Sequence, residues 1–431
     1  MGYVEQFLPT GGFQWVYNPV NTFHSKQNMD EVIKYWRREI LSLDDEANIG
    51  LMLEVDLEYP NELHDLHDTY PLAPEHVNIK NDMLYNYQQK LAKELGVKVG
   101  GDKLCLTLKD KKRYICHYRN LKQYLQLGLK LIKVHRVLKF NQSPWLKPYI
   151  DLNTRFRQQA LSKFEYDFAK LMNNSFFGKT CEDVRKYKDI RIVIDGKKAQ
   201  KLINKPTYNR SKRYNENMAA IQLIKQVVNL NKPRYIGMTI LNLSKIIMYD
   251  FHYNFILTTF PGKKLLFTDT DSFCYEIQTN KNIPEEFKRS GLIDFSNYPT
   301  DSKYYDESKK LVPGFFKDET AGVPIIEFVG LRSKMYSLLK VDGNTKKTCK
   351  GVNKVVKDEI IKHKHFKEAL EENRIRYDKI TKIIHENHEL YTAETSKCSL
   401  SPFNDKKYIT RENGQLMSLS FGHYLLRGGL E

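Results

Sequence analysis

Two aspartates separated by one residue are the side chains of this 431-residue chain best placed to do chemistry. The segment Leu265–Ile277 reads LLFTDTDSFCYEI, with apolar and aromatic residues on both sides of Thr268–Ser272. This pattern predicts two short strands joined by an acidic turn. Strand alternation would direct Asp269 and Asp271 to the same side, where their carboxylates would share a cation or else repel each other. An ordinary turn explains the same spacing, because Asp stabilises turns through its own backbone.

A second group of candidates lies on a long helix predicted over 152–184. Lys170, Asn174 and either Phe177 or Gly178 stand at positions i, i+4 and i+7 or i+8, so they share one helix face. A cation, an amide, an aromatic ring and a residue without a side chain suit a nucleoside triphosphate, with its phosphates at the lysine. An amphipathic helix that ends at a glycine cap explains the same residues.

The charge of the chain indicates a polyanionic partner. There are 69 Lys and Arg residues against 52 Asp and Glu, a net charge of +17, which favours nucleic acid over a membrane. No apolar run approaches the roughly 20 residues of a spanning helix. The six cysteines are scattered without a C-x-x-C pair, so we expect free thiols in a reducing, intracellular compartment and no structural zinc.

The remaining elements follow from periodicity and turn residues. We expect an irregular segment over 1–28 and a basic insertion between Ile190 and Arg234. Within the loop 60–74, His64, Asp65, His67 and Asp68 are either solvated or metal ligands, and we favour solvated side chains. Helices are predicted over 30–41, 83–95, 121–128, 237–257 and, in a charged region, 354–390. Single strands are predicted over 50–59, which should be half-buried, and over 132–140 and 416–425. Paired strands are predicted over 103–109 with 113–118, as a hairpin-like pair, and within 328–340.

Taken in order, these motifs resemble those of family B DNA polymerases, specifically the protein-primed branch of phages, adenoviruses, linear plasmids and Polinton or Maverick transposons. TDTDS is similar to palm motif C, and Lys170–Gly178 is similar to the fingers motif K-x-x-x-N-S-x-Y-G, with Phe177 in place of tyrosine. Lys334-Met335-Tyr336 matches the K-x-Y element, and Lys350-Gly351 resembles a downstream basic-glycine element. The strings LPTGGFQWV, EVDLEYP, YPLAPE and LNLSKIIMYDFHY look most like Polinton-type members.

The resemblance implies an α+β fold with palm, fingers and thumb, and without the exonuclease domain. The expected divisions are 1–150, an N-terminal palm portion with a first terminal-protein-region-like insertion; 151–190, the fingers; 191–235, a basic second insertion acting in strand displacement and processivity; 236–345, the palm with motif C and the K-x-Y strand; and 346–431, the thumb and C-terminal region.

The same resemblance implies roles for individual residues. Asp269 and Asp271 would be catalytic ligands of two Mg²⁺ ions. Nucleotide binding would fall to Lys170, Asn174, Phe177, Gly178 and Arg157, with Arg155 a weaker candidate. DNA binding would fall to Ser175, Lys334, Tyr336, Lys350, Gly351, Lys212 and Arg213. The expected partners are a DNA primer-template, deoxynucleoside triphosphates and a terminal priming protein, with no membrane.

The sequence has no clear match to one element of the family, motif A. Motif A would supply a third carboxylate, but Asp56 in VDLEYP has its tyrosine two residues too soon. We therefore expect motif A and the preceding exonuclease domain to be absent, the chain to be N-terminally truncated, its second metal site to be incomplete, and its activity to be weak. A non-catalytic DNA-binding remnant and a metal nuclease are the alternatives, and the nuclease lacks a further carboxylate cluster.

Overall fold

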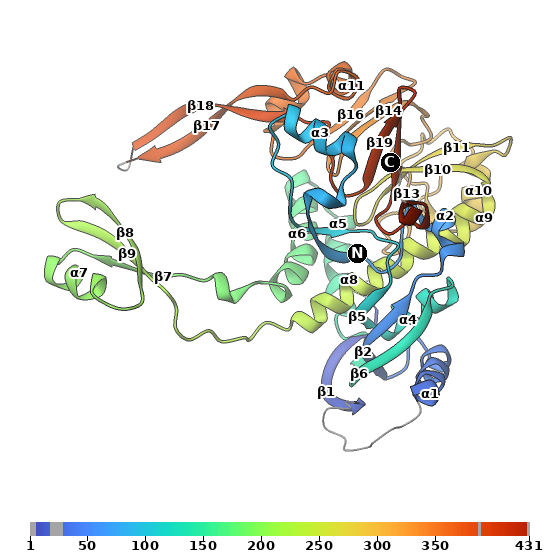
Figure 1. Cartoon of the computed structure of the whole chain (residues 1–431), viewed down its shortest axis with the longest axis horizontal. Coiled ribbons are helices and arrows are strands. Elements are labelled where there is room, and N and C mark those ends of the chain that lie inside the picture. The colour runs from blue at the N-terminus through green and yellow to red at the C-terminus, as the bar shows by residue number, and fades with distance from the viewer. Residues whose placement is uncertain (1–5, 18–28, 387–388, 429–431) are drawn as a thin grey trace.

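The structure, a computed structural model, describes residues 6–17, 29–386 and 389–428. Helices and strands are mixed along these ranges, which confirms the predicted α+β class. Figure 1 shows a body of helices and small sheets from which two long arms extend to one side. The first arm contains β7 (Asp189–Val193), α7 (Gly196–Ile203), β8 (Tyr208–Asn215) and β9 (Met218–Leu223), and the second arm is the hairpin of β17 (Arg376–Glu386) and β18 (Glu389–Leu400).

A four-stranded antiparallel sheet forms the N-terminal part of the body. Its strand order is β1 (Leu8–Tyr17), β6 (Lys130–Ser143), β2 (Ile49–Glu58) and β5 (Lys111–His117), and α1 (Met29–Ser42) contacts β6. The helix predicted over 30–41 and the strands over 50–59 and 132–140 are confirmed. The irregular segment predicted over 1–28 is wrong for β1, because this stretch pairs with β6. Positions 1–5 and 18–28 lie outside the described residues.

The two strands predicted as a hairpin over 103–109 and 113–118 do not pair with each other. β4 (Gly101–Cys105) pairs with β3 (Glu75–Ile79), whereas β5 pairs with β2. The hairpin prediction is wrong because each strand has a partner more distant in sequence. For β5 that partner places Cys116 in the main core.

The acidic residues of β2 are buried, which the predicted half-buried strand did not anticipate. Glu54 is 6% exposed; its carboxylate lies 2.7 Å from Arg113 Nε and accepts a hydrogen bond from Arg136 Nε at 2.5 Å. Burial by itself raises the pKa of Glu54, but the two guanidinium groups outweigh it and hold the pKa below its ordinary value. The prediction is wrong because cations, rather than water, cover this face of the strand.

One long helical segment runs through the body. It consists of α8 (Arg234–Tyr249), a π-helix (Asp250–Ile256) and α9 (Leu257–Thr259), which confirms the helix predicted over 237–257. It leads directly into the hairpin of β10 (Gly262–Thr268) and β11 (Phe273–Gln278). Among the described helices, none is long and apolar enough to cross a membrane.

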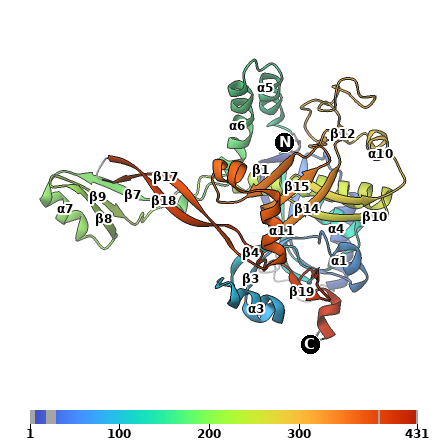
Figure 2. The same ribbon diagram turned by 90° about the horizontal axis from the view of Figure 1, so that it is seen from above.

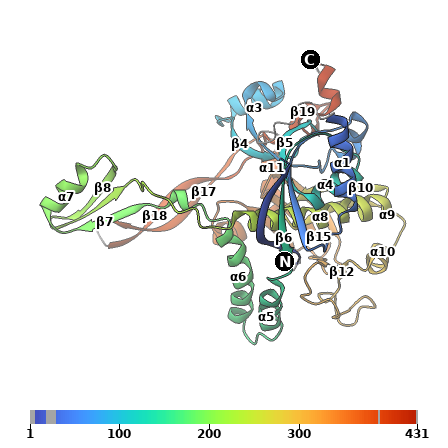
Figure 3. The same cartoon turned by 90° about the horizontal axis from the view of Figure 1, so that it is seen from below.

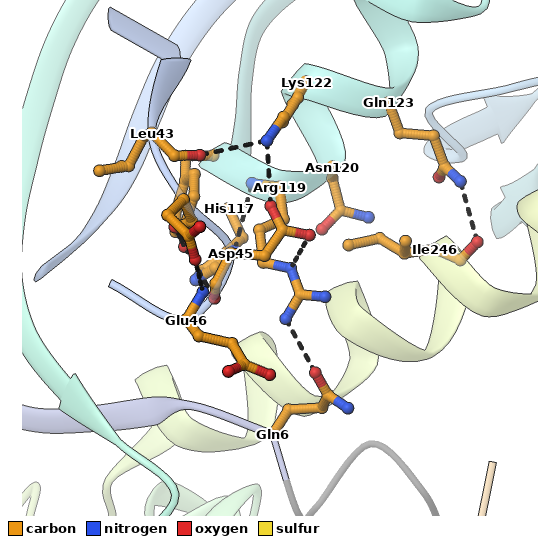
Figure 4. Close-up of polar contacts among 12 residues, drawn as sticks. Gln6, Leu43, Asp45, Glu46, His117, Arg119, Asn120, Lys122, Gln123 and Ile246 are labelled. Atoms are coloured by element: carbon orange, nitrogen blue, oxygen red, sulfur yellow. Dashed lines mark hydrogen bonds and ion pairs between the residues drawn. The ribbon is translucent and has the colours of Figure 1, made fainter. Parts of the chain in front are cut away.

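A short helix, α4 (Tyr118–Gln126), joins this helical segment to the N-terminal sheet, as predicted over 121–128. Gln123 Nε2 donates a hydrogen bond to the Ile246 carbonyl of α8 at 2.9 Å. On the other side of α4, Arg119 and Lys122 form ion pairs with Asp45 at 3.0 and 3.2 Å (Figure 4). α4 is therefore fixed at both sides, and α8 is fixed with it.

The single helix predicted over 152–184 is two helices, α5 (Lys147–Gln158) and α6 (Lys163–Thr180). The Glu165 backbone N–H donates to Ser162 Oγ at 3.2 Å, and the Ser162 N–H donates to the Glu165 carboxylate at 3.3 Å. This capping box starts a new helix at that point. The prediction is wrong because it overlooked the S-x-x-E signature. Figure 2 shows α5 and α6 together, projecting from the body in a direction different from that of the arms.

The first arm overlaps most of the predicted basic insertion 191–235. Its three strands form a sheet in the order β7-β9-β8, and α7 packs against them. Residues 191–235 contain eleven Lys and Arg and two acidic residues, a net charge of +9. More than half of the net charge of the chain is therefore carried by this segment.

The second arm was predicted as a charged helix over 354–390, and this prediction is wrong for most of its length. Among the described residues of this stretch, helical structure is confined to a π-helix (Val356–Ile360) with the two residues that precede it and to α11 (His363–Glu371). The following stretch is rich in β-branched residues, among them Ile380, Ile383 and Ile384, which favour a strand. Figure 3 shows this hairpin extending in the same direction as the first arm.

The C-terminal half adds two further small sheets. The strand pair predicted over 328–340 is confirmed by β14 (Ile325–Arg332) and β15 (Met335–Lys340), with β16 (Thr345–Cys349) beside β15 and α11 packed against both β14 and β15. β20 (Gln415–Leu419) overlaps the start of the predicted strand region 416–425 and pairs with β19 (Tyr408–Glu412). β19 contacts α3 (Asn86–Glu94), which confirms the helix predicted over 83–95.

The histidines of the loop 60–74 are buried, so the solvated interpretation is wrong for them. His64 is 0% and His67 1% exposed, and His67 Nδ1 lies 2.8 Å from the Tyr59 hydroxyl. Burial lowers the pKa of His67 to about 4. His67 is therefore a neutral core residue.

We predict that acid destabilises this fold through its buried histidines. Burial lowers the pKa to about 4 for His67 and His252 and to about 3 for His117, whereas unfolded histidine titrates near 6.5. Below pH 6.5 the unfolded chain binds protons that the folded chain does not. Each such histidine therefore lowers the free energy of unfolding by about 1.4 kcal/mol per pH unit down to its folded pKa.

Urea unfolding measured between pH 7.5 and 5 checks this dependence. His252→Gln should make the pH dependence shallower, whereas His76→Gln, at an exposed position, should leave it unchanged. A free energy of unfolding that stays constant from pH 7 to 5 contradicts the prediction.

Candidate active site

The predicted acidic turn joins β10 and β11 over residues 269–272. Thr268 pairs with Phe273, and the Asp269 N–H donates to the Ser272 carbonyl at 3.1 Å. Thr270 has a φ of +57°, in the left-handed region. The hairpin is confirmed, but both aspartates lie in the turn itself, so the turn conformation and not strand alternation places their carboxylates.

Lys334 of the K-x-Y element lies beside this turn. Its Nζ is 3.2 Å from Asp269 Oδ1, across two half-exposed side chains. Lys334 lies in the turn between β14 and β15, with a φ of +58°. Among the described residues, the Asp271 carboxylate has no ion pair or hydrogen bond. The two carboxylates therefore differ: one is already neutralised by a lysine and the other is exposed.

Aromatic stacking holds the two hairpins together. The Tyr336 and Phe267 rings lie 4.2 Å apart, between centroids, at 23°, and the Phe328 ring lies 5.7 Å from that of Phe267. Such stacked pairs contribute about 0.5–1.5 kcal/mol beyond their buried area. Sequence reasoning assigned Tyr336 but missed Phe267. Its signal was an aromatic residue immediately before TDTDS.

The basic-glycine element joins the same site. The Lys350 N–H donates to the Lys334 carbonyl at 3.0 Å, and Gly351 has a φ of +89°, a conformation that favours glycine. The structure thus brings together Asp269, Lys334, Tyr336 and Lys350-Gly351, which stand far apart in the sequence.

The residues of the predicted nucleotide-binding face lie on α6, and nucleotide binding by them stays a prediction. Lys170, Asn174 and Gly178 are exposed, and a Cβ at Gly178 would meet no atom within 4 Å. Phe177 differs from the prediction: its ring is half-buried and packs against the cluster containing Ile236. The open part of this face therefore consists of a cation, an amide and bare backbone.

The long helical segment connects α6 to the acidic turn. At its start, a Cβ on Gly237 would lie 2.3 Å from Cys181 Sγ, so glycine allows the end of α6 to pack closely. At its π-helix, His252 Nδ1 lies 2.9 Å from the Tyr275 hydroxyl of β11. Among the described residues, no hydrogen bond or ion pair links Lys170 directly to the turn. The helical segment formed by α8, the π-helix and α9 therefore sets the relative position of Lys170 and the acidic turn.

The remaining predicted residues lie outside this assembly. Arg157 is on α5, not on the helix of Lys170, and its guanidinium stacks over the Tyr166 ring at 4.3 Å. Ser175 Oγ donates to the Met172 carbonyl at 3.0 Å. Lys212 and Arg213 are on β8 in the first arm (Figure 1). Arg155 is exposed on α5. Ligand contacts of these residues stay predictions.

The Asp56 carboxylate binds other residues and does not provide a third carboxylate beside Asp269 and Asp271. Its Oδ1 accepts hydrogen bonds from the Arg113 N–H at 2.7 Å and from His135 Nε2 at 2.8 Å. Burial raises the pKa of Asp56, but these hydrogen bonds outweigh it and lower the pKa. Within the described ranges, no group of three or more His, Cys, Asp and Glu side chains is arranged to hold a metal ion.

The donors at the turn nevertheless fit Mg²⁺. This ion takes oxygen ligands and commonly binds through one or two carboxylates together with water and substrate phosphates. Asp269 and Asp271 are two such carboxylates on one turn.

We predict that Lys334 weakens cation binding at this turn. Lys334→Ala removes the ammonium from Asp269, so the affinity for Mn²⁺ should rise by up to about fivefold, the range of a surface ion pair. Calorimetric titration of the purified chain measures this affinity. Lys340→Ala, the same change of charge on β15, is the control. Unchanged or weaker Mn²⁺ binding by Lys334→Ala argues against the prediction.

The sequence model of the family described as DNA polymerase type B, organellar and viral, matches residues 53–257. No curated protein matches the sequence.

The fold is similar to that of Phi29 DNA polymerase in a solved ternary complex. The ternary complex with primer-template DNA and incoming nucleotide substrates has a TM-score of 0.50 at 14% identity, covering 93% of this chain and 56% of that one. The post-translocation binary complex with primer-template DNA has a TM-score of 0.49 at 14% identity, covering 92% and 55%. The chain spans about half the length of these structures. Residues 53–257 thus carry the sequence pattern of the organellar and viral type B DNA polymerases, and the chain has a family B polymerase fold.

Proposed function

We propose that this chain is a DNA-directed DNA polymerase of the protein-primed type, which transfers nucleotides to a primer under the direction of a template. The observation that carries the proposal is the meeting of the acidic turn with the K-x-Y hairpin. Asp269 and Lys334 lie 3.2 Å apart, and Phe267 stacks on Tyr336. An anionic metal-binding turn beside cationic and aromatic groups suits the end of a primer.

Asp271 and Asp269 would hold the metal ions. When bound, Mg²⁺ supplies positive charge at the attacking and leaving oxygens of the displacement. The exposed Asp271 offers free oxygens, whereas Asp269 exchanges its contact with Lys334 for a cation. Lys334 is then available to a phosphate of the primer.

The exposed face of α6 would bind the incoming nucleotide. Lys170 neutralises charge on the triphosphate, an electrostatic contribution that needs no proton transfer. Gly178 leaves open surface beside it for the base pair, with Asn174 between them. The half-buried Phe177 supports this surface from the side of α8.

The arms would hold DNA outside the site. Residues 191–235, which contain most of the first arm together with Lys212 and Arg213, carry a net charge of +9. Contacts of such residues with phosphates position the duplex without reading its sequence. We assign this arm to strand displacement and processivity. The proposal also includes a terminal priming protein as a partner of this chain and a Polinton-type transposon as its origin.

A non-catalytic DNA-binding protein is the second candidate. One observation favours it: among the described residues the turn presents two carboxylates, and one of them already pairs with Lys334. Such a protein would bind DNA through the same basic surfaces and would not catalyse nucleotide transfer.

We predict that primer extension depends on Asp271. Asp271→Asn removes an anionic ligand from the turn, so Mg²⁺-dependent extension of a labelled primer-template should fall by about a hundredfold or more. Asp301→Asn makes the same change at an exposed position outside the proposed site residues and should extend like the unaltered chain. Both variants should bind the primer-template equally well.

Two outcomes decide against the polymerase proposal. DNA binding without extension by the unaltered chain supports the second candidate. Undiminished primer extension by the Asp271→Asn variant shows that the Asp271 carboxylate of the acidic turn is not needed for the reaction.

A further inference from the structure

A cavity of about 460 Å³ lies where four elements meet. Its lining comes from α2 (His64–His67), the end of α4 with the residues that follow it, the segment 234–259 and the start of β10. The described residues that line it include none of those proposed above for metal, nucleotide or DNA binding. Ligand pockets of proteins commonly have such a volume, with mostly apolar walls and a few placed polar groups.

The wall of this cavity is largely apolar. Leu127 and Leu257 line it as half-buried side chains, and Leu66 lines it as an exposed one. Tyr253 adds its ring, because its hydroxyl proton is donated to the Tyr70 carbonyl at 2.7 Å. These side chains would cover the apolar part of a ligand rather than a charged group.

His67 supplies a hydrogen-bond donor to the cavity. The side chain is buried, and its ring lies 4.6 Å from the Tyr253 ring, between centroids. The Tyr59 hydroxyl accepts the Leu72 N–H at 3.1 Å, so its own proton is donated to His67 Nδ1 at 2.8 Å. Burial lowers the pKa of His67 to about 4, and a neutral ring that accepts at Nδ1 carries its proton on Nε2. Among the described residues, this Nε2–H has no partner.

Lys263 supplies a positive charge without a counter-ion. Its Nζ donates to the Leu257 carbonyl at 3.4 Å, a long hydrogen bond, and it forms no ion pair with any described residue. The side chain is half-buried, so solvent screens its charge less than that of the exposed Lys264 beside it. An anion would therefore gain more at Lys263 than at a lysine on the open surface.

We propose that this cavity binds a small amphipathic carboxylate, with its anionic head at Lys263 and its apolar body against Leu127 and Leu257. The charge favours an anion, the leucines favour an apolar body, and the His67 N–H is a further donor for a polar group of the ligand. The contact of Lys263 with Leu257 places the two kinds of wall side by side. This site is separate from the proposed polymerase function and does not depend on it.

Calorimetric titration of the full chain with octanoate, without DNA or nucleotides, tests this site. We expect saturable binding of octanoate and about tenfold weaker binding of octanol, which keeps the apolar body and lacks the charge. Lys263→Met removes the ammonium and keeps most of the side chain. It should weaken octanoate binding about tenfold and leave octanol binding unchanged, which also shows that the variant is folded.

Lys264→Met is the matched control. It makes the same change at the next residue of β10, which is exposed and does not line the cavity, so octanoate binding should stay unchanged. Leu66→Trp adds bulk at an exposed position of the lining and should weaken the binding of both compounds.

Three outcomes overturn the site: no saturable octanoate binding by the unaltered chain, equal affinities for octanoate and octanol, or equal octanoate affinities of Lys263→Met and the unaltered chain. Each of them leaves the polymerase proposal standing, because primer extension is measured separately.

Discussion

The arrangement of this molecule depends on the burial of one helical segment, 234–259. Its first turns accept the end of α6 because Gly237 has no side chain to keep Cys181 away. Its middle accepts a hydrogen bond from Gln123 of α4, and its π-helix places His252 against Tyr275 of the acidic hairpin. A displacement of this segment moves the proposed nucleotide-binding face and the acidic turn relative to each other.

The site itself is assembled from contacts between two hairpins, and each contact has a different physical origin. The Phe267–Tyr336 stack is largely apolar and positions the strands. The Lys334–Asp269 pair is electrostatic, half-exposed and therefore exchangeable. Stacking beside an exchangeable ion pair would keep the backbone in place if the proposed metal ion replaced Lys334 at the carboxylate.

The sequence was informative wherever a local pattern decided the structure. The TDTDS turn, the helix over 237–257 and the exposed face of Lys170, Asn174 and Gly178 follow from turn chemistry and periodicity. Long-range pairing was not predictable in this way: β5 pairs with β2, and Glu54 is buried because Arg136 comes from a distant strand. The contact of Lys334 with Asp269 joins residues 65 positions apart, so the resemblance indicated both but their proximity required the structure.

The central claim is that template bases direct chemistry at the acidic turn. Its most direct test is single-nucleotide incorporation by the unaltered chain with Mg²⁺, using four primer-templates that differ only in the templating base, each with all four nucleotides tested separately. We predict that only the complementary nucleotide is added on each template. Incorporation that ignores the templating base, or the absence of incorporation on all four, would contradict the claim.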